Sequence, residues 1–167
     1  DENYTLTADE NGNIAIDKLP EGRTLKNTEA ENVFTAISNL RFNDVVKTKD
    51  GLNFNKTYIC KKADETVYTF YLAEKDGKYY AKCFAEYTGE QVTKSMQVES
   101  EEVLKAKEAK MLAQERVLRF EHKTKGWIFE LPSTSAEKMT KPVEDLLEEL
   151  PEPEPEKAEE KPETVTE

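Results

Sequence analysis

Between residues 56 and 87, apolar and polar side chains alternate with a period of two, which is typical of β-strands that bury one face. Three such runs span Lys56 to Lys62, Val67 to Ala73 and Tyr79 to Tyr87. Between the second and third runs, Asp76-Gly77 supplies the positive φ angles that a tight hairpin turn requires. The pattern therefore predicts a three-stranded antiparallel meander.

A turn centred on Asp76-Gly77 sets the register of the hairpin, with Phe70 opposite Cys83 and Leu72 opposite Ala81. One face of the meander then carries Tyr58, Cys60, Tyr68, Phe70, Leu72, Ala81, Cys83 and Ala85. The other face carries Thr57, Thr69, Tyr71, Tyr80, Lys82, Phe84 and Glu86. Two strand spacings separate Cys60 from Cys83 by roughly 9–10 Å. That separation is too long for a disulfide, so we expect two free thiols.

The residues before the meander predict a hairpin, a helix and a short strand. Tyr4 to Asp17 forms two apolar runs around Gly12 and predicts the hairpin. Thr28 to Glu31 is a capping-box sequence that predicts the start of a helix. The buried stripe of this helix is expected to be Val33, Phe34, Ile37 and Leu40. Arg41 to Val46 predicts a short strand.

The residues after the meander predict a long helix, a strand and a short helix. The long helix is expected from Ser100 to about Lys123, with apolar members Leu104, Met111, Leu112, Val117, Leu118 and Phe120. Trp127 to Leu131 predicts a strand. A second capping box, Thr134 to Glu137, predicts a helix that Pro142 restarts through Leu150. Its apolar face would consist of Val143, Leu146, Leu147 and Leu150.

These elements predict an α+β fold in which an antiparallel meander packs against two or three helices. We expect residues 1–150 to form one α+β interaction domain. Segments 4–46 and 126–150 both run in the order glycine, apolar strand, proline and capped helix. They are either two related strand–helix units around the meander or a chance similarity.

Residues 151–167 form a Glu/Pro-rich segment without aromatic side chains, which predicts a disordered acidic tail. From Glu144 onward the chain has 11 acidic and 2 basic residues, a net charge of −9 out of −11 for the whole chain. This tail is either a solubilising spacer or a ligand for a basic partner. Because an acidic protein repels phosphate backbones, we expect no nucleic-acid partner.

The sequence holds no apolar run long enough to span a bilayer and no signal-peptide pattern. The chain begins at Asp1 without a methionine. We therefore expect a fragment of a longer protein, which would reach a membrane only through a segment outside this chain.

No arrangement of residues predicts catalysis, so we expect no enzyme and no cofactor. His122 is the only imidazole, and its place near a predicted helix end is typical of a residue that stabilises the helix terminus. Two cysteines cannot form a cysteine-rich zinc site, and no glycine-rich loop is present to hold a phosphate. A hydrolase would instead need two carboxylates that converge in a cleft.

The best candidate interaction surface is the second face of the meander, with Tyr71, Tyr80, Lys82 and Phe84. Either a helix covers this face, most simply the long one, or the face is open. An open aromatic patch with a polar rim would be typical of a protein contact. The alternative is a module that binds a glycan or another small ligand.

Two stretches resemble a known family. VFTAISNLRFNDVV, from Val33 to Val46, is similar to the helix and following strand of domain-of-unknown-function family 4340. GWIFELP from Gly126, followed by KMTKPVEDLL from Lys138, resembles the closing segment of many members. With the meander between them, the similarity covers most of Tyr4 to Leu150.

The resemblance implies a bacterial, membrane-anchored protein whose bulk lies on the extracytoplasmic side of the membrane. It also implies a scaffold or accessory role beside gliding-motility-type ABC exporters, whose subunits would be the protein partners. It carries over no active-site residue. We therefore expect a non-catalytic protein-interaction domain of the cell envelope.

Overall fold

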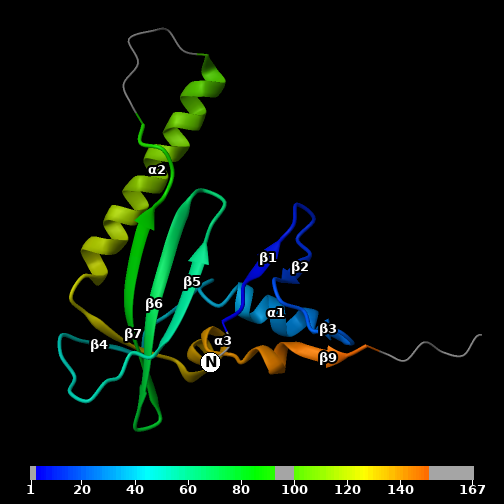
Figure 1. Ribbon diagram of the computed structural model, residues 1–167. Coiled ribbons are helices and arrows are strands. Elements are labelled where there is room, and N and C mark those ends of the chain that lie inside the picture. Colours follow the sequence, from blue (N-terminus) through cyan, green and yellow to red (C-terminus); the bar gives the residue numbers. More distant parts are fainter. Residues whose placement is uncertain (1–2, 93–99, 151–167) are drawn as a thin grey trace, which may run out of the picture.

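The centre of the molecule is a five-stranded antiparallel sheet with strand order β4-β8-β7-β6-β5 (Figure 1). The computed structural model describes residues 3–92 and 100–150. The strands are β4 (Asp44–Val46), β5 (Lys56–Lys61), β6 (Thr66–Lys75), β7 (Lys78–Tyr87) and β8 (Ile128–Leu131). Together with three α-helices, the sheet confirms the predicted α+β class.

The predicted meander and its register are confirmed. Phe70 pairs with Cys83 and Leu72 with Ala81, as the hairpin turn requires. Asp76 and Gly77 have φ angles of 53° and 71°. Two successive positive φ angles match the right-handed twist of the flanking strands, so this turn locks β6 to β7. The thiols of Cys60 and Cys83 are free.

One face of the sheet, called the inner face, holds the core. The buried cluster consists of Ala36, Phe70, Leu72, Ala81, Cys83, Phe129, Leu131, Ala136 and Met139. Members from β6 and β7 sit at alternating positions, because successive side chains of a strand point to opposite faces. All the strand residues in this cluster therefore share one face, and residues from the helical segments cover it.

The described residues form three α-helices, α1 (Asn27–Phe34), α2 (Glu101–Thr124) and α3 (Ser133–Met139). Figure 1 shows α2 beside β7, with its N-terminal half extending past the end of the sheet. Ser100 caps α2, since its hydroxyl accepts from Val103 N. At the other end Phe120 packs edge-on against Tyr68, with 5.2 Å between ring centroids.

Both predicted capping boxes are wrong. The first helical residue of α1 is Asn27, so Thr28 lies inside the first turn, and no side chain caps the helix. Helix α3 follows Pro132, again without a side-chain cap. Proline has a fixed φ that suits the entry to a helix, so α3 begins before the Thr134 box.

The predicted buried stripe after Thr28 is also wrong in part. Helix α1 ends at Phe34, whose side chain is exposed. Buried positions are instead Ala30 and Val33 in the helix and Ala36 just beyond it. Ile37 and Leu40 still pack against the core, but from a non-helical turn.

The prediction of a helix from Pro142 to Leu150 is wrong. A short 3₁₀ turn, η1 (Val143–Leu146), leads into strand β9 (Leu147–Glu149), which pairs with β3 (Arg23–Leu25). Leu146 and Leu147 are buried, whereas Leu150 is exposed. The backbone of β3 supplies a hydrogen-bonding partner from far along the chain, and this tertiary pairing overrides the helical spacing of the leucines.

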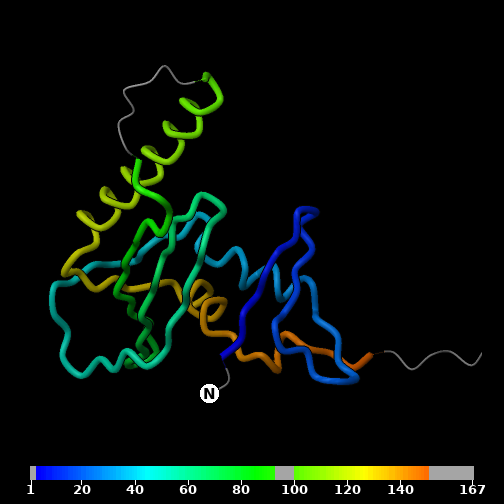
Figure 2. The backbone as a smooth tube through the Cα atoms, turned by 45° about the horizontal axis from the view of Figure 1, so that its top comes forward, coloured from blue at the N-terminus to red at the C-terminus, as the bar shows by residue number. Residues whose placement is uncertain are grey.

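The predicted hairpin around Gly12 is confirmed as β1 (Leu6–Ala8) and β2 (Ile14–Ile16). Figure 2 shows this hairpin beside β3 and β9, on the side of the molecule away from α2. Segments 4–46 and 126–150 meet twice, because β3 pairs with β9 and β4 with β8. The tail predicted at 151–167 lies outside the described residues.

Candidate interaction surface

The face of the sheet opposite the core, called the outer face, carries the residues selected from the sequence. Its cross-strand rows are Ile59–Thr69–Phe84, Thr57–Tyr71–Lys82 and Ala73–Tyr80. Residues in one row point to the same side, since directly paired residues of antiparallel strands share a face. Tyr71, Tyr80, Lys82 and Phe84 therefore do lie on one face, as predicted.

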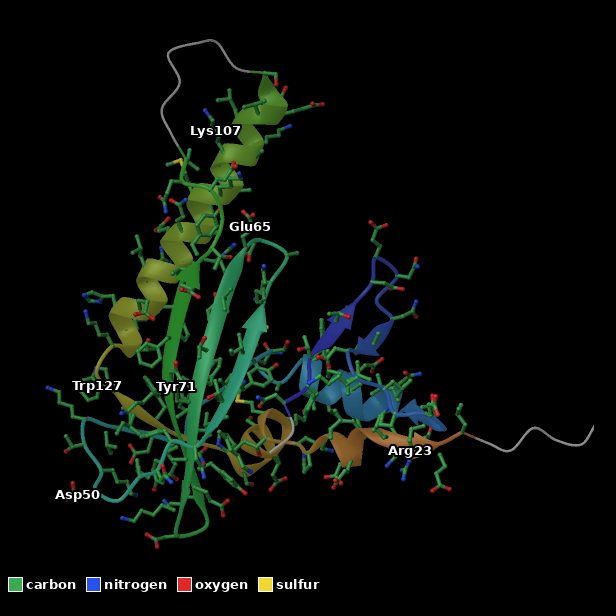
Figure 3. All side chains as sticks on the ribbon, viewed as in Figure 1. Arg23, Asp50, Glu65, Tyr71, Lys107 and Trp127 are labelled. Carbon is green, nitrogen blue, oxygen red and sulfur yellow. The ribbon has the colours of Figure 1, made fainter. Side chains whose placement is uncertain are left out.

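Three large apolar side chains on this face are open to solvent, and we call Ile59, Tyr71 and Phe84 the outer patch. Their exposed fractions are 63%, 41% and 43%. The rings of Tyr71 and Phe84 meet edge-to-face, with centroids 5.6 Å apart. The prediction for this face did not include Ile59. Ile59 is two residues after Thr57 on β5, so strand alternation places both side chains on the same face. Figure 3 labels Tyr71 on β6.

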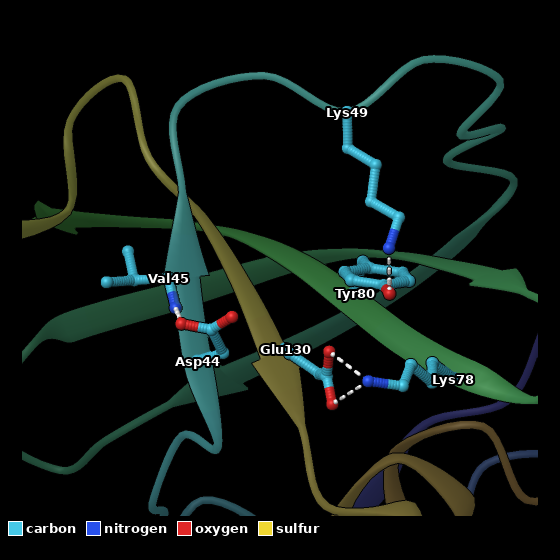
Figure 4. A network of polar contacts seen from close by, with 6 residues as sticks. All are labelled: Asp44, Val45, Lys49, Lys78, Tyr80 and Glu130. Atoms are coloured by element: carbon cyan, nitrogen blue, oxygen red, sulfur yellow. Dashed lines mark hydrogen bonds and ion pairs between the residues drawn. The ribbon is translucent and has the colours of Figure 1, made fainter.

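Tyr80 is not part of the exposed surface, which corrects the prediction. Its side chain is only 2% exposed. The ammonium group of Lys49 lies 4.2 Å from the ring centroid and also donates a hydrogen bond to the phenolic oxygen. Figure 4 shows Lys49 reaching down to Tyr80 from the loop between β4 and β5. Tyr80 therefore anchors that loop to the sheet.

The helix expected to cover this face does not cover it. Helix α2 contacts Tyr68 on the inner face and the free edge of β7, where Glu121 Oε1 accepts from Ala85 N at 2.5 Å. The cover is instead partial and comes from the 47–55 loop, which holds Lys49 over Tyr80 and Phe54 against Lys82. The part of the face farther from this loop stays open.

Beside the loop lies a shallow groove of about 630 Å³, which we call the lysine groove. Its walls are the 47–54 loop, the Lys82–Phe84 part of β7 and the start of β8. Aromatic residues Phe54, Phe84 and Trp127 line it together with Lys47, Lys49 and Lys82. Because Phe84 belongs to both, the groove continues the outer patch.

Each lysine of the groove stands over an aromatic ring. Lys47 Nζ lies 5.2 Å from the centroid of Trp127, and Lys82 Nζ lies 4.5 Å from that of Phe54. Asp50 is the only acidic residue among those lining the groove. In the described part of the chain, no carboxylate forms an ion pair with Lys47, Lys49 or Lys82. By contrast, Lys78 at the nearby turn binds both carboxylate oxygens of Glu130 at 3.0 Å (Figure 4).

The candidate nucleophiles and bases do not converge. Burial raises the pKa of the Cys83 thiol to about 12 and also raises that of Cys60, so both favour the unreactive protonated form. His122 is exposed near the end of α2. Across residues 3–92 and 100–150, no three His, Cys, Asp or Glu side chains are grouped to hold a metal ion.

A second concave region lies beside the N-terminal hairpin. It is a shallow depression of about 840 Å³ lined by Tyr4, Lys18, Arg23, Glu144 and neighbouring residues. The hydroxyl of Tyr4 donates to the Lys141 carbonyl at 2.9 Å, which connects the two ends of the described chain beside this depression. We assign it a structural role between sequence-distant segments.

The fold and this surface define an α+β protein with a packed inner face and a partly open outer face. Comparisons with protein-family models, with curated protein sequences and with solved structures returned no match. The resemblance to domain-of-unknown-function family 4340 thus stays a hypothesis. No helix within the described ranges combines the length and hydropathy needed to cross a bilayer.

Proposed function

We propose that this chain is a non-catalytic protein-interaction domain that contacts its partner through the outer patch. The observation that carries the proposal is the exposure of Ile59, Tyr71 and Phe84 on one face of a sheet. Solvent-exposed aromatic and branched side chains that cluster beside a polar rim are typical of protein contacts.

The patch is also held in place before any partner arrives. Its strands β5, β6 and β7 are paired along their length, and their other face is packed into the core. Tyr71 and Phe84 further restrict each other by their edge-to-face contact. Aromatic anchors with little freedom to lose contribute most to binding, because less entropy is lost when they are covered.

The cellular setting of the proposal comes from the resemblance described above. It implies a domain on the extracytoplasmic side of a bacterial membrane, as a scaffold or accessory of an ABC exporter. A membrane anchor would then belong to a segment outside this chain. The exporter subunits are the corresponding candidate partners.

Photo-crosslinking in the source cells tests this function. A photoreactive residue is placed at Ile59 or Tyr71 and, as a matched control, at Leu118, which is 70% exposed on α2. We expect the two patch positions to yield one discrete crosslinked envelope protein and Leu118 to yield none. Tyr71→Ala should reduce the yield at Ile59 about tenfold if the ring is an interface anchor.

Equal crosslinking from Leu118 and from the patch, or none from the patch, would contradict the proposal.

A glycan array tests the alternative, a module that binds a glycan. Binding to a defined glycan that Tyr71→Ala abolishes, without any protein crosslink at Ile59, would favour a glycan-binding function instead.

A further inference from the structure

Strand β5 is the last strand of the sheet on the side of the N-terminal hairpin (Figures 1 and 2). Lys62 N donates to Thr66 O at 2.8 Å, and every second residue of β5 counted back from Lys62 bonds to β6 in the same way. The residues between them, Thr57, Ile59 and Lys61, therefore direct their N–H and C=O groups away from β6. We call this outward row the β5 edge. Within residues 3–92 and 100–150, no group hydrogen-bonds to it.

The opposite edge of the meander, by contrast, is closed. Strand β8 pairs with β7 only as far as Ala81, and beyond that point Ala85 N donates to Glu121 Oε1 of α2 at 2.5 Å. Unpaired strand edges are templates to which another strand can add, and proteins commonly cover them. This fold covers the edge of β7 with a helix, whereas all three residues of the β5 edge are exposed.

The surroundings of the β5 edge are basic, although the chain carries a net charge of −11. Residues 56–62 include Lys56, Lys61 and Lys62 and no acidic residue. Among the described residues, no carboxylate forms an ion pair with any of these lysines. Unpaired positive charge beside an open edge favours a strand that carries carboxylates.

The same lysines disfavour a second copy of this chain as the added strand. Pairing of β5 with β5 of another copy would bring three lysines from each copy into one two-stranded ribbon. Like charges on paired strands are destabilising, and lysines on an edge strand commonly prevent such self-association. The sequence that fits this edge is therefore acidic and different from that of β5.

We propose that an extended, acidic segment of the partner protein adds to the sheet along the β5 edge. Its backbone pairs with Thr57, Ile59 and Lys61, and main-chain hydrogen bonds of this kind provide the affinity of strand addition. An apolar side chain opposite Ile59 joins the outer patch, and carboxylates opposite Lys56 and Lys61 provide selectivity. The inference rests on the proposed function, because it specifies the chemistry of the partner at the outer patch.

Thr57 offers a matched pair of variants that tests the backbone contact. Thr57→Pro removes one outward N–H, whereas Thr57→Ala removes the same side chain and keeps the N–H. Proline is tolerated on an edge strand where its nitrogen faces away from the neighbouring strand, so both variants should keep the pairing with β6. Urea denaturation of the full chain verifies that both variants are folded.

The probe is a synthetic peptide, Glu-Glu-Thr-Val-Thr-Val-Glu, titrated into the full chain and followed by NMR. Antiparallel docking places its glutamates opposite the lysines of residues 56–62 and a valine opposite Ile59. We expect Thr57→Pro to bind the peptide about tenfold more weakly than Thr57→Ala, which corresponds to the loss of one backbone hydrogen bond.

Amide hydrogen exchange gives a signature that a side-chain contact would not produce. With saturating peptide, the N–H groups of Ile59 and Lys61 should exchange about tenfold more slowly, because they gain a hydrogen bond. Those of Tyr58 and Cys60 should change little, because they already bond to β6. The expected pattern is therefore protection at alternate residues of β5.

A charge variant tests the selectivity for an acidic strand. Lys56→Gln with Lys61→Gln should weaken peptide binding about tenfold at low salt, and high salt should reduce the difference as charges are screened. The matched change Lys123→Gln with Lys125→Gln, at the C-terminal end of α2, should leave binding unchanged. Equal weakening by both pairs would show that only net charge matters and would contradict the proposed strand.

Absence of peptide binding, equal affinities of the two Thr57 variants, or uniform slowing along β5 would overturn the proposal. Slow exchange at Ile59 and Lys61 before the peptide is added would also overturn it, because the edge would then be occupied already. Crosslinks from Tyr71 report on the proposed function separately. They persist if a partner covers the outer patch without adding a strand, so the two failures are distinguishable.

Discussion

Asp64 connects the turn between β5 and β6 to helix α2. Its carboxylate accepts hydrogen bonds from the Thr66 hydroxyl at 2.5 Å and from Arg116 at 2.6 Å. Burial by itself would raise the pKa of Asp64, but the bonds from Thr66 and the charge of Arg116 outweigh it and lower the pKa. Thr66, which donates the shortest of these bonds, is fully buried.

A lowered pKa in the folded state makes part of the stability dependent on pH. Ionised Asp64 stabilises the fold above the pKa of the unfolded chain, and this contribution is lost as pH falls through the folded pKa. We expect Asp64→Asn to lower the free energy of unfolding at pH 7 by about 1 kcal/mol, a value kept small because the pair is partly exposed and screened.

Urea unfolding at pH 7 and at acid pH measures this effect. The parent should lose more stability than Asp64→Asn on acidification, so the two curves should converge at low pH. Arg116→Gln serves as the comparison, since it removes the ionic partner and keeps the carboxylate. A constant difference between parent and Asp64→Asn at every pH would refute the assignment.

The outer face shows which residue properties the sequence could predict. Strand alternation placed Tyr71, Lys82 and Phe84 correctly, because side-chain direction in a strand depends only on position. It could not predict that Tyr80 is buried. That outcome depends on Lys49, 31 residues away, folding over the ring.

At the scale of elements, helix α2 has two unlike halves. Its C-terminal half contacts the sheet through buried Ala113 and Val117 and through Phe120. Its N-terminal half extends past the sheet (Figure 1). Val103, Leu104 and Met111 in this half are exposed. The Ser100 cap, the Glu101–Lys105 ion pair and the Lys110–Glu90 ion pair stabilise this part.

Two neighbouring residues of α2 test this division. Val117 is 6% exposed and its neighbour Leu118 is 70% exposed. We expect Val117→Ala to lower the free energy of unfolding by roughly 1–3 kcal/mol, because it removes buried methyl groups. Leu118→Ala should change it by no more than about 0.5 kcal/mol. Chemical denaturation measures both, and equal losses would show that α2 packs through a different face.

The extent of α2 was predictable from the sequence, whereas its buried face was not. Acidic residues at its start, the Ser100 cap and Gly126 after its end are local signals. Four of the six apolar residues that the sequence places in this helix are exposed, namely Leu104, Met111, Leu112 and Leu118. The sheet contacts only part of the helix. The length of the strands, rather than the sequence of the helix, determines how many helical turns can pack against the sheet.

At the scale of the whole molecule, residues 141–150 hold the N-terminal region in place. Lys26 N donates to Leu146 O at 2.8 Å, and Lys141 forms an ion pair with Glu29. The strand pair β3–β9 adds backbone hydrogen bonds between residues more than 120 positions apart. Backbone pairing and an ion pair therefore connect the first and last described segments.

Leu146 and Leu150 distinguish this arrangement from the helix that the sequence predicted. The side chain of Leu146 is fully buried, whereas that of Leu150 is exposed. Leu146→Ala should lower the free energy of unfolding by roughly 2–5 kcal/mol, and Leu150→Ala by no more than about 0.5 kcal/mol. Urea denaturation compares the two. Similar losses would support a shared helical face instead of β9.

The sequence by itself determined the α+β class, the meander with its register and the extent of α2. These features follow from local causes: alternation of side chains, the positive φ angles of Asp76-Gly77 and the signals at helix ends. Tertiary structure decided that residues 147–149 form a strand, that Tyr80 is covered and that α2 leaves the outer face open. Each of these outcomes depends on a contact with a segment distant in sequence, and the energy of such a contact is not encoded in the local pattern.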